Sequence, residues 1–217
     1  MSETQTLLDP RVAEAMHPVE VVRWAHDQFG DGLVVTCSFA DAVLPHIISQ
    51  GAPGAAVVLL DTQYLFAETI WFARALTRDL GLNLQVMEPL VDMDDRWQHD
   101  VESCCHVRKV EPLERALAGR AGWVTGVRRV DAPTRANTPV VSHDLLRDIV
   151  KINPLATWTD DDMATYIEGE GLPEHPLTSK GYPSIGCWPC TQPVAAGADP
   201  RSGRWAGLGK TECGLHR

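Results

Sequence analysis

The chain has 217 residues and a formal net charge of −10 at pH 7, from 29 acidic residues against 19 lysines and arginines. This balance disfavours nucleic-acid binding, because neutralising phosphates requires a basic face. The longest apolar run, residues 55–60, is too short to cross a bilayer, and the N-terminal residues lack the basic start and apolar core of a secretion signal. We therefore expect a single domain over residues 1–217 of a cytoplasmic protein that binds neither nucleic acid nor membranes.

The sequence alternates between strand-like and helix-like segments. Apolar residues at helical spacing follow Pro18 and end at Gly30, which predicts the first helix. In chain order, we then expect a strand over 32–39, a helix over 41–50, a strand over 55–60, a helix over 68–80, a strand over 83–87, a helix over 107–117, a strand over 122–127, an extended segment over 148–155 and a helix over 160–168. This alternation predicts an α/β fold with a mostly parallel sheet and helices on both faces.

Glycine and proline become frequent after residue 171, and the apolar periodicity disappears. We expect residues 172–217 to form a loop-rich segment wrapped on the sheet. Polar residues follow three of the expected strands, at 36–38, 61–63 and 126–129. Because ligands bind at the carboxyl ends of parallel strands, these sets suggest a site for a nucleotide or another polar small molecule, although ordinary loop polarity is an alternative.

Four of the six cysteines form two close pairs, Cys104 with Cys105 and Cys187 with Cys190. Without a secretion signal, such pairs indicate metal ligands or catalytic thiols more than disulfides. Adjacent side chains on a helix diverge by about 100°, which suits two irons of a 4Fe-4S cluster better than one zinc ion. Zinc and unligated thiols remain alternatives. A thioredoxin-like dithiol is disfavoured, because Cys187 and Cys190 lie near the end of the chain and not after the first strand.

A further cysteine, Cys213, lies near the end of the chain between Lys210 and His216. A thiol reacts as its thiolate, and cationic neighbours lower its pKa, so Cys213 is a candidate nucleophile even though Glu212 opposes this effect. Nearby glycines would allow this tail to swing Cys213 toward a substrate and away again. The alternative is a frayed terminus with an idle cysteine.

Arginines form two groups that could bind the substrate of such a nucleophile. Arg201 and Arg204 precede Cys213, whereas Arg128, Arg129 and Arg135 follow the strand expected over 122–127. A guanidinium binds phosphate or sulfate through paired hydrogen bonds, so these arginines predict an anion site in an otherwise acidic chain. Solubility of the surface explains any single arginine equally well.

Taken together, three segments resemble assimilatory adenylyl-sulfate (APS) reductases of the iron-sulfur type. They are the Cys-Cys pair at 104–105, the run Gly-Tyr-Pro-Ser-Ile-Gly-Cys-Trp-Pro-Cys-Thr at 181–191, and Lys-Thr-Glu-Cys-Gly-Leu-His at 210–216. Segments 60–69, 126–129 and 151–159 are similar to other parts of the family, and the resemblance runs from about residue 32 to the end. It implies an adenine nucleotide α-hydrolase-like fold and a role in sulfate assimilation and cysteine biosynthesis.

The resemblance also implies a mechanism and roles for individual residues. The thiolate of Cys213 would attack the sulfate sulfur of APS, AMP would leave, and a reduced thioredoxin or glutaredoxin would release sulfite from the resulting S-sulfocysteine. The matching residues are Cys104, Cys105, Cys187 and Cys190 as ligands of one 4Fe-4S cluster, Lys109 between cluster and substrate, Arg201, Arg204 and His216 around the phosphosulfate, and Ser38, Gly126 and Arg135 at the nucleotide. Arg128 is a further candidate from the arginine group. In this family the cluster is thought to tune the site electrostatically.

The chain also departs from related proteins. Residues 37–42 lack the glycine-bearing phosphate loop of ATP pyrophosphatases, and Asp41 would repel a phosphate, which argues against ATP hydrolysis and against an ATP-using sulfur transferase. Two further alternatives are a 3'-phosphoadenylyl-sulfate (PAPS) reductase, whose members usually lack the cysteine pairs, and an iron-sulfur redox sensor without catalysis. The sequence leaves open whether the protein forms a homo-oligomer.

Overall fold

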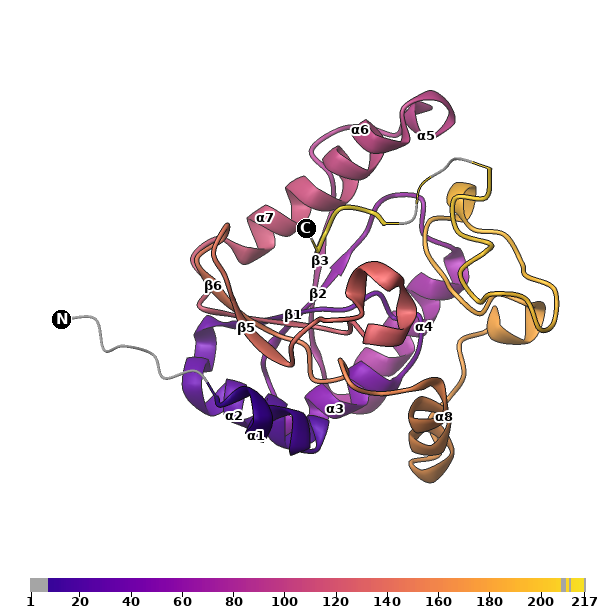
Figure 1. Cartoon of the computed structure of the whole chain (residues 1–217). Coiled ribbons are helices and arrows are strands. Elements are labelled where there is room, and N and C mark those ends of the chain that lie inside the picture. The colour runs from indigo at the N-terminus through magenta and orange to yellow at the C-terminus, as the bar shows by residue number, and fades with distance from the viewer. Residues whose placement is uncertain (1–7, 208–209, 211, 217) are drawn as a thin grey trace.

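The computed structural model describes residues 8–207, 210 and 212–216. Its centre is a six-stranded sheet with the strand order β3-β2-β1-β4-β6-β5 (Figure 1). The strands are β1 (Leu33–Thr36), β2 (Ala56–Leu60), β3 (Asn83–Met87), β4 (Gly122–Thr125), β5 (Val141–Asp144) and β6 (Ile149–Ile152). Five of these strands run parallel, and β5 pairs antiparallel with β6. The mostly parallel sheet predicted from the sequence is confirmed.

Helices cover both faces of the sheet. They are α1 (Pro10–Ala15), α2 (Pro18–Phe29), α3 (Val43–Gly51), α4 (Ala67–Leu80), α5 (Arg96–His99), α6 (Val101–Cys105), α7 (Glu111–Leu117) and α8 (Asp160–Gly169). Successive strand residues point to opposite faces: Val35 of β1 packs in the core with α2, α3 and α4, whereas Val34 packs with α7. Both faces of the strands are therefore apolar, as expected for a parallel sheet covered on each side.

Two expected elements differ from the prediction in ways that matter for the site. The helix expected over 41–50 begins at Val43, after Ala42 as N-cap, and the Asp41 carboxylate before it accepts a hydrogen bond from the Val43 amide (2.9 Å). The helix expected over 107–117 begins at residue 101 and includes a π-helical segment, His106–Val110, between α6 and α7. Helices α1, α5 and α6 and strand β5 were not predicted.

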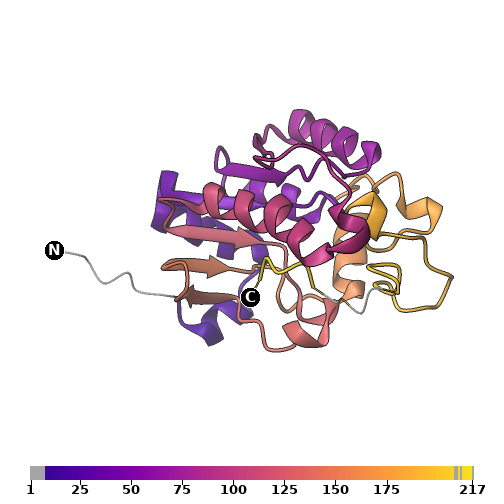
Figure 2. The same cartoon turned by 90° about the horizontal axis from the view of Figure 1, so that it is seen from above.

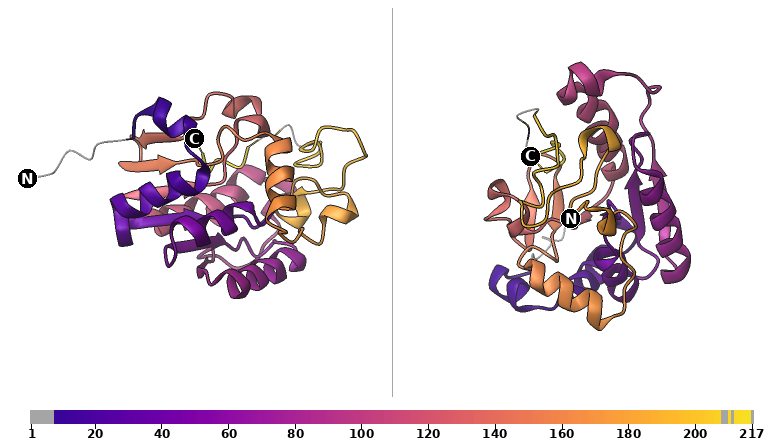
Figure 3. Two further views of the ribbon diagram at one scale, coloured as in Figure 1. Left: turned by 90° about the horizontal axis from the view of Figure 1, so that it is seen from below. Right: turned by 90° about the vertical axis from the view of Figure 1, so that its right-hand side faces the viewer.

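The loop-rich segment after residue 171 lies at one end of the sheet, beside α4 and α8 (Figures 1 and 3). Among its described residues it contains two short 3-10 turns and is connected by isolated β-bridges, Leu65 with Cys187 and Thr191 with Arg204. From there the tail returns over the sheet toward α7 (Figure 2), where Leu215 packs on the core between α7 and the sheet. Of the described helices, none has the length and apolarity needed to cross a bilayer.

Candidate functional site

A cavity of about 550 Å³ lies where the carboxyl ends of β1, β2 and β4 face the loop-rich segment and the tail. All the predicted catalytic and substrate-binding residues line it. They are Ser38, Lys109, Gly126, Arg128, Arg135, Arg201, Arg204, Cys213 and His216. The sheet topology therefore joins residues that are far apart in the sequence in one pocket, as expected at the carboxyl ends of parallel strands.

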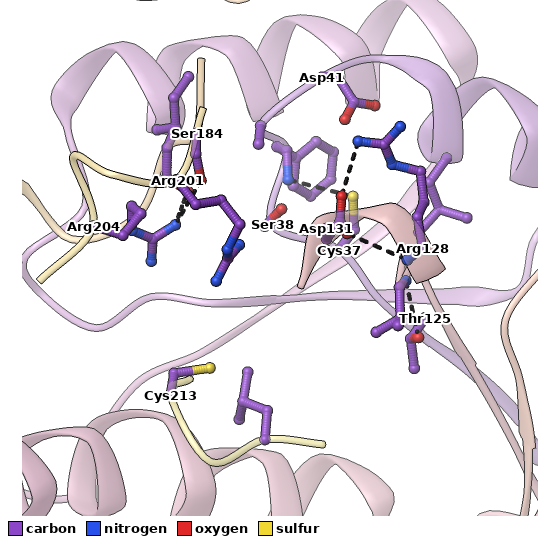
Figure 4. A pocket seen from close by; sticks show the side chains of 18 of the residues that line it. Cys37, Ser38, Asp41, Thr125, Arg128, Asp131, Ser184, Arg201, Arg204 and Cys213 are labelled. Atoms are coloured by element: carbon purple, nitrogen blue, oxygen red, sulfur yellow. Dashed lines mark hydrogen bonds and ion pairs between the residues drawn. The ribbon is translucent and has the colours of Figure 1, made fainter. Parts of the chain in front are cut away.

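The loop after β1 forms the wall of this pocket opposite the tail (Figure 4). Phe39 adopts a left-handed backbone conformation with φ of 52° and is fully buried, so its packing offsets the strain of this conformation. Burial raises the pKa of the Cys37 thiol, which accepts a hydrogen bond from the Phe39 amide (3.4 Å). Cys37 is therefore an inert thiol, and Ser38 is the exposed polar side chain of the loop.

The arginines after β4 are held by carboxylates. Arg128 pairs with Asp131 (2.8 Å) and with Asp160 (2.9 Å), and both guanidinium contacts lie in the pocket wall. Arg129 points elsewhere, because it pairs with Glu14 (2.5 Å) on α1 and donates to the carbonyl of Thr138. The grouping of Arg129 with the anion site, suggested by its position in the sequence, is therefore wrong.

Arg204 reaches the pocket from the loop-rich segment and contacts neutral groups. It donates to the Ser184 hydroxyl (3.3 Å) and the Ile185 carbonyl (3.1 Å), and its guanidinium lies 4.7 Å from the centre of the Trp205 ring. Burial and the charge of Arg201 lower its pKa, yet an arginine stays protonated at neutral pH. Figure 4 shows Arg201 and Arg204 on one side of the pocket with Cys213 across from them, so their positive charge faces the thiol.

The tail is docked by contacts on both sides of Cys213. Lys210 pairs with Glu102, and Glu212 pairs with Arg135 (2.6 Å). His216 stacks on the ring of Trp123, with the centroids 5.6 Å apart and the planes 19° apart. Burial and the charges of Lys151, Arg135 and Arg147 hold the pKa of His216 well below its usual value, so its ring is neutral. The sequence-based expectation of a charged His216 beside the thiol is therefore wrong.

The cation behind Cys213 is Lys109, from the π-helical segment. Its ammonium group is buried 5.9 Å from the centre of the Trp205 ring. Burial alone would lower the pKa of Lys109, but attraction to the thiolate forms of the nearby Cys187, Cys213 and Cys105 outweighs this effect and raises it. Lys109 lines both the pocket and the smaller cavity behind it, so it lies between the tail thiol and the paired cysteines.

The smaller cavity brings the two cysteine pairs together. Cys104 and Cys105 end α6, and Cys187 and Cys190 approach from the loop-rich segment; all four thiols line this cavity. The Thr62 hydroxyl lies 3.2 Å from the Cys187 sulfur. Burial and the other thiols raise the pKa of Cys104 to about 11. Among the described residues, no three side chains of histidine, cysteine, aspartate or glutamate converge as ligands of a single ion would.

The same cavity contains a buried arginine whose importance the sequence did not reveal. Arg108 is 1% exposed, donates to the Gln63 amide oxygen (2.5 Å) and the Asp92 carbonyl (2.6 Å), and pairs with Asp94 (3.2 Å). Its Nε has no partner among the described residues. In the sequence, Arg108 lies between His106 and Lys109 in a short basic run after the cysteine pair, and nothing in that run indicates that Arg108 is buried.

Residues 32–193 match the model of the phosphoadenosine phosphosulfate reductase domain. The chain belongs to this family. Its relatives include the adenosine 5'-phosphosulfate reductase of Mycolicibacterium smegmatis, 48% identical over 91% of this chain and 87% of the relative, and that of Streptomyces coelicolor, 45% identical over 95% and 91%. The family assignment made from the sequence is confirmed.

Solved structures agree with the fold. The phosphoadenylyl-sulfate reductase of Candida auris, in a phosphate complex, superposes with a TM-score of 0.73 at 26% identity and covers 85% of this chain and 98% of its own. The FMN adenylyltransferase of Candida glabrata, with an ATP analogue, superposes with a TM-score of 0.61 at 12% identity, covering 89% of this chain and 69% of its own. The second match shows the fold alone, and it agrees with the predicted α/β class.

Proposed function

We propose that the chain is an APS reductase that converts adenosine 5'-phosphosulfate to sulfite and AMP, and that residues 1–217 work as a single sulfonucleotide reductase domain. One observation carries the proposal: Cys213 faces Arg201 and Arg204 across a pocket at the carboxyl ends of parallel strands. Relatives named adenosine 5'-phosphosulfate reductase that align with most of this chain give independent support.

The pocket offers separate places for the two halves of such a substrate. In our proposal the nucleoside lies against Ser38 and Gly126, at the ends of β1 and β4, and the phosphosulfate lies toward Arg201 and Arg204. Arg204 suits an anion because its contacts are with a hydroxyl, a carbonyl and a ring, so its charge is not already neutralised by a carboxylate. Arg128 would form part of the pocket wall on the nucleotide side.

The chemical step would be a displacement at sulfur. The Cys213 thiolate attacks the sulfate sulfur, a sulfur–sulfur bond forms, and the bond from sulfur to the bridging phosphate oxygen breaks with its electron pair on AMP. Arg201 and Arg204 would stabilise the charge that develops on the departing phosphate, and Lys109 would stabilise the thiolate. A dithiol protein such as thioredoxin or glutaredoxin then attacks the Cys213 sulfur, releases sulfite, and supplies two electrons as its thiols become a disulfide.

The four paired cysteines fit one 4Fe-4S cluster as a resident cofactor. Buried thiols are its usual ligands, and the unpartnered Nε of Arg108 in the same cavity is a donor that a cluster sulfur would satisfy. When bound, the cluster would supply a fixed charge beside the pocket. Cys104, Cys105, Cys187 and Cys190 would hold it, and Lys109 would stand between it and Cys213. A cytoplasmic location fits both a cluster and a reducing dithiol partner.

Intact-protein mass spectrometry tests the covalent step. The parent protein, incubated with APS and no reductant, should gain one sulfonate-sized adduct, and Cys213→Ser should gain none. Absence of the adduct in the parent, or equal labelling of the Cys213→Ser variant, would show that this mechanism is wrong.

Two further assays test the substrate and the cofactor. Because the family also contains PAPS reductases, APS and PAPS should be offered in competition, and higher turnover of PAPS would overturn the assignment.

Iron and acid-labile sulfide should be found together in protein purified without oxygen. Stoichiometric zinc without sulfide would instead indicate a structural zinc site.

A further inference from the structure

Glu212, the residue directly before Cys213, is held by an arginine of the pocket wall. Its carboxylate accepts hydrogen bonds from Arg135 Nε (2.8 Å) and Nη2 (2.6 Å), and from the Thr134 hydroxyl (3.1 Å). The pair is largely enclosed, because the side chains of Arg135 and Glu212 are 13% and 24% exposed. A paired, partly buried contact of this kind is among the stronger polar interactions in proteins.

Arg135 is itself fixed, so the contact has a defined position. Its Nη1 donates to Asp131 (3.3 Å), and Asp131 in turn accepts from Arg128 (2.8 Å). Both arginines belong to the loop that follows β4 and line the pocket. The tail is therefore attached, one residue before its thiol, to the same framework that forms the nucleotide side of the pocket.

The pairing also removes an electrostatic penalty. An unpaired carboxylate next to Cys213 would oppose formation of the thiolate. Burial favours the protonated form of Glu212, but the hydrogen bonds and charge of Arg135 outweigh this and lower its pKa, so the carboxylate is ionised and compensated. Glu212, whose position in the sequence opposes a reactive Cys213, is thus compensated by an arginine from a distant segment.

We propose that Glu212 is a positioning residue: through Arg135 and Thr134 it docks the tail with Cys213 facing the pocket before substrate arrives. Docking itself does not depend on the reaction, whereas its consequence for catalysis rests on the proposed APS reductase activity. Arg135 then serves the tail as well as the nucleotide, and departure of the tail toward a reductant requires this pair to open.

Alkylation of Cys213 in the full-length protein without nucleotide tests the docking. Peptide mapping after timed exposure to iodoacetamide should show Cys213 reacting about tenfold faster in Glu212→Gln than in the parent, because a charge-assisted pair has been removed. Glu111→Gln is the matched control. It breaks a carboxylate–arginine contact of the same 2.6 Å length, with Arg115 on α7, and should leave the rate within about twofold.

Two more variants separate docking from a general loss of structure. Arg135→Gln should accelerate alkylation as much as Glu212→Gln, and the double variant should react no faster than either single one. Glu212→Asp, which keeps the charge, should restore part of the protection. Unchanged alkylation in Glu212→Gln, or additive effects in the double variant, would overturn the proposal.

A single-turnover experiment tests the consequence for the reaction. Glu212→Gln should form the S-sulfonate about tenfold more slowly while its affinity for AMP stays unchanged, because the nucleotide contacts are intact. An equal loss of AMP affinity would assign Glu212 to nucleotide binding and overturn the positioning role. If the parent forms no adduct at all, the proposed activity fails, but the alkylation results still decide the docking.

Discussion

Gly186 provides the space in which the guanidinium of Arg204 lies. A Cβ at this position would be 2.3 Å from Arg204 Nη2 and 2.6 Å from its Cζ, so the arginine could not keep its contacts with Ser184 and Ile185. This close approach explains why the residue before Cys187 must be small. A substitution at Gly186 would therefore displace the Arg204 guanidinium without removing its charge.

We predict that Gly186→Ala weakens AMP binding about tenfold, since one charge-assisted contact to phosphate is lost. Isothermal titration calorimetry measures this directly. Gly169→Ala, at the end of α8, is the control, because its Cβ would meet nothing within 4 Å and its AMP affinity should match that of the parent. Unchanged affinity in Gly186→Ala would mean that Arg204 does not contact the nucleotide.

His175 shows how a buried histidine can be fixed in its neutral form. Its Nδ1 accepts a hydrogen bond from the Leu177 amide (3.1 Å), so the proton is on Nε2, which donates to the Thr69 hydroxyl (3.1 Å). The residue is 2% exposed, and burial lowers its pKa to about 4. Protonating Nδ1 would direct a second N–H group at the Leu177 amide.

This arrangement predicts a loss of stability in acid. The unfolded chain binds the proton near pH 6.5 and the folded chain near pH 4, so the contribution of His175 is present above pH 6.5 and is lost as the pH falls toward 4. Denaturant titrations of the parent and His175→Gln should show the difference in unfolding free energy shrinking with falling pH, by at most about 1.4 kcal/mol per pH unit. A pH-independent difference would contradict the prediction.

At the level of elements, the π-helical segment His106–Val110 directs two consecutive basic residues to different partners. Arg108 enters the protein interior toward Gln63 and Asp94, and Lys109 turns toward the tail and Trp205. π-helical turns often occur at functional sites, because the wider turn redirects side chains that a regular helix would space evenly. Here it joins the cysteine pair of α6 to the loop after β2.

We predict that Arg108→Met lowers the free energy of unfolding by about 3 kcal/mol, because the Gln63 amide oxygen and the Asp92 carbonyl lose this donor and Asp94 keeps only its pair with Arg96. Arg78→Met is the control. Arg78 pairs with Asp79 on the surface of α4, and its side chain is 75% exposed, so its loss should leave the free energy of unfolding nearly unchanged. Chemical denaturation measures both free energies. Equal effects of the two substitutions would show that Arg108 does not stabilise the contact between the π-helical segment and the loop after β2.

Across the whole molecule, stability should be highest in the middle of the sheet and lowest in the tail. Strand β1 lies between β2 and β4, and Val34 and Val35 are fully buried. In contrast, residues 212–216 of the tail are held mainly by side-chain contacts and lie outside the sheet. The proposed nucleophile, Cys213, is therefore on a segment that we expect to open without unfolding of the core.

Hydrogen exchange measured by mass spectrometry tests this order. Amides of β1 should exchange most slowly, at the rate of global unfolding, and amides of residues 212–216 should exchange fastest among the segments that form the pocket. Glu212→Gln should accelerate exchange in the tail and leave β1 unchanged. Tail amides that exchange as slowly as those of β1 would argue against a tail that opens separately.

Much of this architecture is local in origin and could be read from the sequence. Apolar periodicity placed most of the strands and most of the helices, and α8 begins at the expected residue 160, where Thr159 and Asp162 form a capping box. The edge strand β5 was missed, because it is short and half exposed and its pairing is set by the neighbouring β6. The motifs at 104–105, 181–191 and 210–216 identified the family, since they combine residue types that chance rarely brings together.

By itself, the sequence determined the family, the α/β class, the candidate nucleophile and the two cysteine pairs, because these depend on residue identity and short-range spacing. Only the tertiary structure decided which partners Glu212 and Arg108 have and that the ring of His216 is neutral. Glu212 meets Arg135 from 77 residues away, Arg108 meets Gln63 from 45 residues away, and His216 is neutral because Trp123 and its surroundings bury it. Burial and long-range pairing set these properties, and neither is encoded in local spacing.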